Sequence, residues 1–261
     1  MFKRRILEFA VEFWKRAGRT ESFPRSLEIA VAWALPLAVI RLPELHLAKI
    51  NFWLSSRGIL LDFCMPDRAV KACVIAKSGC GMVFLDGRDP VDEQRFSLAH
   101  EVSHFLMDYI EPRQKALSRL GPAIKDVVDG LRPATIEERL SGLLEGVNIG
   151  IFHDFLQRSS EGAIDSCTTL NSEDDADQLA LELLAPCFSV LKRAEEHGIN
   201  WRETNAVDFC AVMLAREFGL PYGIAMRYSN MLVSWRRHAR SIREWLGIDR
   251  SVCRTSDIPS E

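Results

Sequence analysis

The chain has 261 residues, 48% of them apolar and 26% charged, which is the composition of a globular protein with one large domain or two modest ones. Its net charge of -3 excludes the overall basic field that drives nonspecific binding to nucleic acid. The seven cysteines are odd in number and include no C-x-x-C pair, which argues against a disulfide framework or a zinc knuckle. The longest apolar run, Ile29 to Ile40, is shorter than the ~20 residues of a membrane-spanning helix. We therefore expect a soluble, cytoplasmic protein without membrane contact.

Residues 1–57 are expected to form an N-terminal helical region. Apolar residues recur at helical spacing over residues 3–17, and Gly18 is a plausible stop. Membrane binding by this amphipathic segment is conceivable, but docking on its own domain is the favoured interpretation. Leu47 to Leu54 reads as a further short helix.

Short runs rich in Val, Ile and Phe then predict a small sheet. They are Ile59 to Phe63, Val70 to Ala76 and Met82 to Leu85, and a glycine-containing turn joins the last two into a hairpin. The strand before Asp86 is the expected sheet edge, where an extended substrate segment can pair by main-chain hydrogen bonds.

The segment from Phe96 to Tyr109 contains a complete H-E-x-x-H motif at His100, Glu101 and His104. On an α-helix the two histidines lie on one face and can bind one Zn²⁺, with Glu101 beside them as a general base. Apolar residues surround most of this helix, which indicates burial, and buried imidazoles and carboxylates need a partner such as a metal. The alternative is a surface helix with solvated His and Glu side chains.

The third metal ligand must come from farther along the chain. The metzincin pattern fails, because Met107 and Ile110 stand where it requires Gly and His. The best source is a predicted helix from Ser172, its candidate N-cap, to Pro186, after a polar loop.

Glu173 and Asp177 lie along the edge of this helix's buried stripe, whereas Glu182 falls on the opposite face. Glu173 can therefore reach a buried metal, and Asp177 can hydrogen-bond the non-metal nitrogen of a histidine. Two alternatives stay open: the acidic residues complement the helix dipole, or Asp174 is the ligand instead. The buried stripe is predicted to consist of Ala176, Leu179, Ala180, Leu183 and Leu184.

Two blocks of sequence carry a resemblance to a known family. Arg95-Phe-Ser-Leu-Ala-His-Glu-Val-Ser-His-Phe-Leu, followed by Glu-x-x-x-Asp-x-x-Ala-x-x-Leu-Leu-x-Pro from Glu173 to Pro186, resembles the ImmA/IrrE family of zinc metallopeptidases. The resemblance covers about residues 58–110 and 170–188. It implies a gluzincin-like fold and site-specific cleavage of a cytoplasmic transcriptional repressor. It also implies zinc ligands at His100, His104 and Glu173, the catalytic glutamate at Glu101 and a histidine-supporting position at Asp177.

The expected architecture is α+β, with a metallopeptidase core over residues 58–188 that combines a small sheet, the H-E-x-x-H helix and a second Glu-bearing helix. The 68 residues from Phe105 to Ser172 exceed the usual family spacing, so residues 112–160 are predicted to be an inserted helical subdomain. In it, Thr135 and Glu138 fit a capping box that begins a helix. The apolar positions of that helix include Leu140, Leu143, Leu144, Val147 and Ile151.

The C-terminal region, residues 189–248, is expected to be helical and is followed by a flexible tail at 249–261. Cys210 to Phe218 and Tyr222 to Trp235 have the rhythm of a helix-turn-helix, and the residues from Arg236 to Arg243 are basic. Direct DNA binding is one interpretation. Packing against the rest of the protein is favoured, because the net charge is negative.

The motif and its spacing lead to an expected function as a zinc-dependent endopeptidase, and the resemblance implies that its substrate is a helix-turn-helix repressor. Zinc polarises the scissile carbonyl and lowers the pKa of its bound water, and Glu101 takes that water's proton. Selectivity is expected from docking on the insertion or the C-terminal helices. The alternative is a regulatory DNA- or protein-binding module whose zinc site is a sensor or a vestige.

Overall fold

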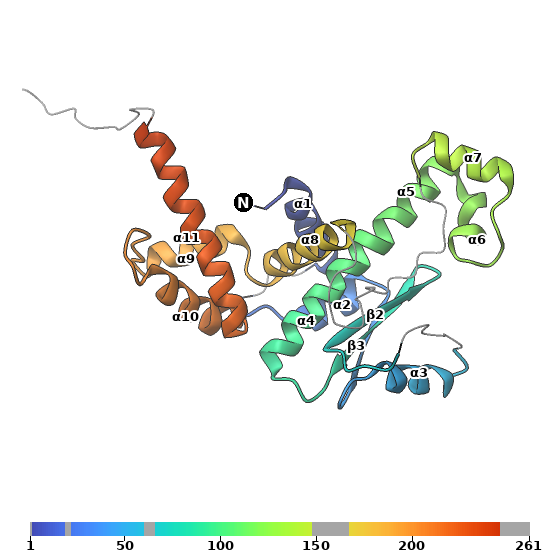
Figure 1. Cartoon of the computed structure of the whole chain (residues 1–261), viewed down its shortest axis with the longest axis horizontal. Helices are drawn as coiled ribbons and strands as arrows, with labels where there is room; N and C mark the ends of the chain where they lie inside the picture. The colour runs from blue at the N-terminus through green and yellow to red at the C-terminus, as the bar shows by residue number, and fades with distance from the viewer. Residues whose placement is uncertain (1, 19–21, 60–65, 148–166, 246–261) are drawn as a thin grey trace, which may run out of the picture.

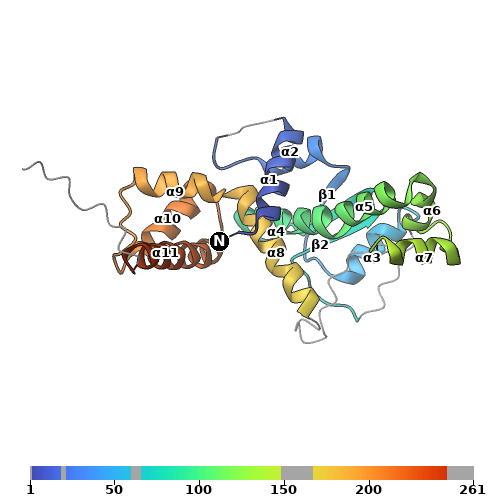
Figure 2. The ribbon, with the colours of Figure 1, turned by 90° about the horizontal axis from the view of Figure 1, so that it is seen from above.

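The computed structural model describes residues 2–18, 22–59, 66–147 and 167–245 (Figure 1). As expected, this part of the chain is α+β, mostly helical with one small three-stranded sheet. Figures 1 and 2 show the C-terminal helices at one end of the molecule and the inserted helices at the other, with the sheet between them. None of the described helices has the length and apolarity to cross a membrane.

The sheet consists of β1 (Leu37–Leu42), β2 (Ala72–Lys77) and β3 (Cys80–Asp86) in the order β1-β3-β2. The expected hairpin is present: β2 and β3 are antiparallel and are joined at Ser78 and Gly79, which both have positive φ. Two expectations were wrong. The N-terminal region contains a strand, β1, which pairs parallel with β3, so β3 is central and β2 forms an edge of the sheet. Of the third expected strand, residues 60–63 lie outside the described residues.

Both faces of the sheet are buried, which explains why β2 and β3 read as continuous apolar runs. Val74 and Val83 face the main core, which also contains α4 (Val91–His104). Ile75 and Phe84 point the other way, against α3 (Leu47–Ser55). The sheet is thereby held between α3 and the helix that carries the motif.

The motif helix continues into the insertion without a break. α4 is followed by a π-helical turn, η1 (Phe105–Ile110), and then by α5 (Glu111–Leu120), visible in Figure 1 as one long helical run. A π-helical turn is uncommon and often occurs at functional sites. Its apolar residues Phe105, Leu106, Met107 and Tyr109 are buried.

α8 (Cys167–Leu184) is the second helix of the core and packs against α4. The predicted buried stripe is confirmed, with all five members fully buried. The helix begins before Ser172, so that residue is not its N-cap, and Glu182 is buried rather than on the opposite, exposed face. The N-terminal helix α1 (Arg4–Ala17) packs on α8 as predicted, while α2 (Leu27–Ala34) packs on α4.

The region predicted to be an insertion is helical over its described residues, 112–147, with η2 (Pro122–Ile124), α6 (Lys125–Val128) and α7 (Ile136–Leu144) after α5. The predicted capping box at Thr135 and Glu138 is confirmed. Of the predicted apolar positions of this helix, the three leucines are exposed and Val147 enters the small local core, while Ile151 lies outside the described residues. Gly142 is the residue of α7 that is buried. That core consists of Ala116, Ile124, Val127, Val128 and Val147.

The C-terminal helices are α9 (Cys187–Glu196), α10 (Ala206–Phe218) and α11 (Tyr222–Trp245). Arg95 of α4 anchors them, because its Nη1 donates to the carbonyl oxygens of Phe218 at 2.7 Å and Gly219 at 3.0 Å. At the start of the basic segment, Arg236 pairs with Glu195 of α9. The α10–α11 turn is therefore tied directly to the helix that carries the motif.

Candidate metal centre

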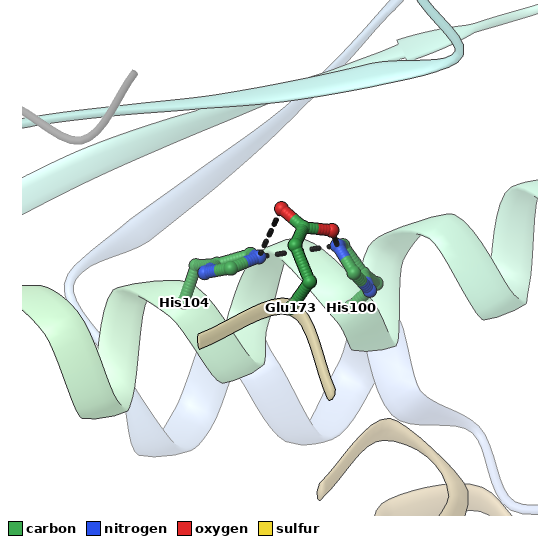
Figure 3. Close-up of side chains that lie close together, drawn as sticks. All are labelled: His100, His104 and Glu173. Atoms are coloured by element: carbon green, nitrogen blue, oxygen red, sulfur yellow. Dashed lines mark hydrogen bonds and ion pairs between the residues drawn. The ribbon is translucent and has the colours of Figure 1, made fainter. Parts of the chain in front are cut away.

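The candidate metal centre lies between α4 and α8, where the structure brings His100, His104 and Glu173 together. His100 and His104 are one helical turn apart on α4, so their rings project from the same face. Glu173 lies on α8 one turn before the fully buried Ala176, whose small side chain allows the two helices to approach closely. Figure 3 shows the two imidazoles directed toward the Glu173 carboxylate.

The separations of the donor atoms fit one tetrahedral metal ion. The two Nε2 atoms are 3.1 Å apart, and the Glu173 oxygens lie 3.5 Å from that of His100 and 3.7 Å from that of His104. Ligand atoms about 2.0–2.1 Å from a tetrahedral ion are about 3.3 Å from one another. Two imidazoles and one carboxylate form a donor set that zinc uses in catalytic sites, with a fourth position for water or substrate.

Each histidine is oriented by a carboxylate on its other ring nitrogen. Nδ1 of His100 lies 2.9 Å from Asp177, and Nδ1 of His104 lies 2.7 Å from Asp108. A proton on Nδ1 that is donated to a carboxylate leaves the lone pair of Nε2 directed at the shared metal position. Ser172 extends this network, because its hydroxyl donates to Asp108 at 2.7 Å.

The charges around the histidines favour a cation at this position. Burial lowers the pKa of His100, but hydrogen bonds to Asp177 and Glu173 outweigh burial and raise that pKa to about 10. Burial likewise lowers the pKa of His104, yet its bond to Asp108 and the negative charge of Glu101 leave the pKa raised. An environment that stabilises positive charge on the rings equally stabilises a metal cation between them.

Glu101 stands beside the metal position, buried at 4% exposure. Burial raises the pKa of its carboxyl group, whereas the charges of His100 and His104 and a hydrogen bond from the backbone N–H of Val74 lower it in part. A carboxylate whose proton affinity is increased by burial is suited to accept a proton during catalysis. The bond from Val74 also joins Glu101 to the edge strand.

A cleft of about 520 Å³ opens onto these residues. Its walls come from α4, from the chain that leads into β2, and from the first turns of α11. At the edge strand, the N–H of Asp86 bonds to Lys71 O, so position 71 points toward β3. Because hydrogen-bonding directions alternate along an antiparallel strand, the N–H and C=O groups of Ala72 and Val74 point to the edge away from β3. The N–H of Val74 is donated to Glu101 there, and Ala72 is the next position along that edge. The candidate metal position, Glu101 and the edge of β2 therefore all line the same cleft.

All five site residues expected from the sequence gather here, whereas the substitute ligand Asp174 does not. Asp174 is exposed and accepts a hydrogen bond from Gln178 at 2.6 Å. Sequence reasoning missed Asp108 and Arg227, which lines the cleft from α11. The spacing of four residues between His104 and Asp108 was an available signal for the first. No local signal connects α11 with the motif.

Comparisons with known proteins return no match: no family model, no curated protein and no solved structure matches the chain.

Proposed function

We propose that this protein is a zinc-dependent endopeptidase with a gluzincin-like core, similar to the ImmA/IrrE family. One observation carries the proposal: a two-histidine, one-carboxylate cluster with a buried glutamate beside it, opening onto a cleft bordered by a strand edge. The charged and polar groups of this cluster are costly to bury, and a metal ion between the two Nε2 atoms and Glu173 would offset that cost.

His100, His104 and Glu173 would hold the ion. Zinc held by them would supply a Lewis acid, able to polarise a scissile carbonyl and to lower the pKa of a bound water. Glu101 accepts the proton of the attacking water and passes it to the leaving amine, so the peptide bond is broken by hydrolysis. Asp177 and Asp108 keep the two imidazoles in the orientation and tautomer that coordination needs.

The edge strand β2 supports a peptide as the substrate. An extended segment can add to its free edge by main-chain hydrogen bonds, which place a peptide bond near Glu101. Such pairing is nearly independent of sequence, so a selective enzyme needs contacts elsewhere on its substrate. The expected target is a cytoplasmic protein, in particular a helix-turn-helix transcriptional repressor cut at one exposed segment.

The alternative of a DNA-binding regulator has less support from the described C-terminal residues. Arg236 pairs with Glu195 at 3.3 Å, and Arg237 donates to the backbone oxygens of Trp201 and Glu203. These arginines contact the protein itself, and the α10–α11 turn is bound by Arg95 of α4. Binding of operator DNA without any repressor would favour the alternative.

The test compares zinc-loaded protein with its Glu101→Gln variant on repressors encoded beside the gene. Zinc content by elemental analysis should be one ion per chain in both, while cleavage followed by mass spectrometry should fall about 10²- to 10⁴-fold in the variant. Glu137→Gln, an exposed change on α7, is the matched control and should retain activity. Equal turnover in Glu101→Gln would remove Glu101 from the mechanism, and ready digestion of casein with every repressor intact would overturn the selective function.

A further inference from the structure

The cleft contains three cationic side chains that the proposed chemistry does not use: Arg68, Lys71 and Arg227. Lys71 has an acidic neighbour, because its Nζ lies 3.5 Å from Glu93 on the cleft wall. Arg68 and Arg227 differ from Lys71, because residues in the described part of the chain accept few of the hydrogen bonds that their guanidinium groups can donate.

Arg68 lies just before β2 and is half-buried. Its Nε atom is buried and finds no hydrogen-bond partner among the described residues. Among those residues its guanidinium also has no ion pair. A buried donor without a partner costs free energy, so its persistence on a cleft wall requires a reason. An acidic group that enters the cleft would supply the missing partner.

Arg227 reaches the cleft from α11. Its contact with Asp177 is long, 3.8 Å, and the other oxygen of that carboxylate is engaged by His100 at 2.9 Å. A guanidinium has five N–H donors, so one long ion pair leaves most of them for another acceptor. Its side chain is 66% exposed, which leaves it accessible to a ligand.

The remaining acidic groups of the cleft are already committed. Glu101 and Glu173 face the metal position, Asp177 orients His100, and Glu93 is next to Lys71. Arg68 and Arg227 are therefore the charges of this cleft that remain to be complemented by a ligand. The part of the cleft that these arginines border extends from Asp177, beside Arg227, to Lys71 and Glu93 near the beginning of α4, with Arg68 three residues before Lys71.

We propose that this part of the cleft binds an extended peptide segment with acidic side chains, and that Arg68 and Arg227 determine this specificity. The inference rests on the proposed peptidase function and narrows its substrate class. Arg68 is six residues before Val74 and lies outside the strand, on the far side of a bend at Lys71. Six residues span at most about 20 Å. Arg68 would therefore contact a carboxylate several positions from the scissile bond, whereas Arg227, next to Asp177 and His100, would contact one close to it.

Binding is measured in the zinc-loaded Glu101→Gln background, so that the peptide stays intact. The probes are two fluorescein-labelled decapeptides of Ala, Val and Leu: one carries two Glu on each side of the centre, and the other carries Gln at the same positions. Fluorescence anisotropy should show about 10-fold tighter binding of the Glu peptide. Because charge attraction is screened by salt, this preference should shrink as the ionic strength rises.

Arg68→Gln and Arg227→Gln in the same background should each weaken binding of the Glu peptide about 5-fold and leave the Gln peptide unchanged. Arg4→Gln, an arginine on α1 whose side chain is 92% exposed, is the matched control. Arg227→Glu should reverse the preference at its subsite toward a peptide with Lys in place of Glu. Circular dichroism checks that each variant is folded. If an arginine variant does not fold, the comparison of the Glu and Gln peptides still tests the proposal, because it uses only the Glu101→Gln protein.

Equal binding of the Glu and Gln peptides, or binding of neither, would overturn this inference. The two proposals can fail separately. A clear Glu preference together with repressors that zinc-loaded protein never cuts would sink the peptidase function and keep the acidic-peptide site. If the protein cleaves a repressor, and Arg68→Gln and Arg227→Gln change neither the cleavage rate nor the affinity for the Glu peptide, the peptidase function is kept and the acidic-peptide site is overturned.

Discussion

The carboxylate of Asp108 lies 2.7 Å from Nδ1 of His104 and accepts a hydrogen bond from the hydroxyl of Ser172 at the same distance. Asp108 lies in the π-helical turn that directly follows the motif helix. A π-helix has more residues per turn than an α-helix, so its side chains are redirected relative to the preceding turns. Asp108 thus connects Ser172 of α8 with His104, although Asp108 is not one of the three candidate metal ligands.

Removal of either supporting carboxylate should weaken metal binding without abolishing it. Asp108→Ala and Asp177→Ala each free one imidazole from its partner, and we expect zinc affinity to fall about 10- to 100-fold. Competition with a chromophoric chelator measures this. Asp175→Ala is the matched control on α8, because that carboxylate pairs with Lys3 rather than with a histidine. Unchanged affinity in Asp108→Ala would show that the contact with His104 is incidental.

Glu173 and Asp174 are adjacent acidic residues that should behave differently. Glu173→Ala removes one of the three proposed ligands, so zinc stoichiometry should drop after dialysis against a weak chelator. Asp174→Ala removes an exposed side chain that bonds to Gln178, and its zinc content should match the unmodified protein. Elemental analysis of the two variants side by side decides this. The opposite result would mean that α8 presents a different residue to the metal.

Gly81→Ala should destabilise the core. A Cβ at Gly81 would lie 2.7 Å from Cδ1 of Leu37 and 2.8 Å from the ring of Phe105, which are both buried. Overpacking of this kind costs about 1–3 kcal/mol, measurable as a lower urea midpoint. Gly223→Ala is the control, because a Cβ there meets no atom within 4 Å and alanine favours a helix. Equal stability of the two variants would contradict the packing of Phe105 on β3.

Glu182 should make stability fall as the pH rises. Burial raises the pKa of this carboxyl group above 4.5, although the N–H of Cys187 and the charge of Arg25 lower it in part. An acid with a raised pKa in the folded state binds its proton more tightly there than in the unfolded chain. Its contribution is therefore complete below the unfolded pKa and is lost as the pH rises through the folded pKa.

Glu182→Gln keeps an oxygen that can accept the bond from Cys187 and removes the ionisation. The variant should match the unmodified protein near about pH 4 and exceed its melting temperature near about pH 8. Thermal unfolding at both pH values measures the difference, with the exposed Glu137→Gln on α7 as control. A stability difference that does not change with pH would show that ionisation of Glu182 is not coupled to folding.

Local periodicity in the sequence was enough to predict the centre of the site. His100 and His104 are four residues apart, and Glu173 and Asp177 lie along the edge of an apolar stripe, so an α-helix fixes their faces whatever the rest of the fold does. The hairpin of β2 and β3 and the capping box at Thr135 follow from equally local signals.

Tertiary structure alone decided which strand is the edge and what else lines the cleft. β1 joins β3 across the 37 intervening residues 43–79, and thereby leaves β2 at the open edge beside Glu101. Arg227 reaches the cleft because α11 packs on the main core and Arg95 binds the α10–α11 turn to α4. Such contacts depend on how separate elements pack, and no residue pattern within a single element encodes them. For the same reason α7 presents Gly142 instead of its leucines to the local core.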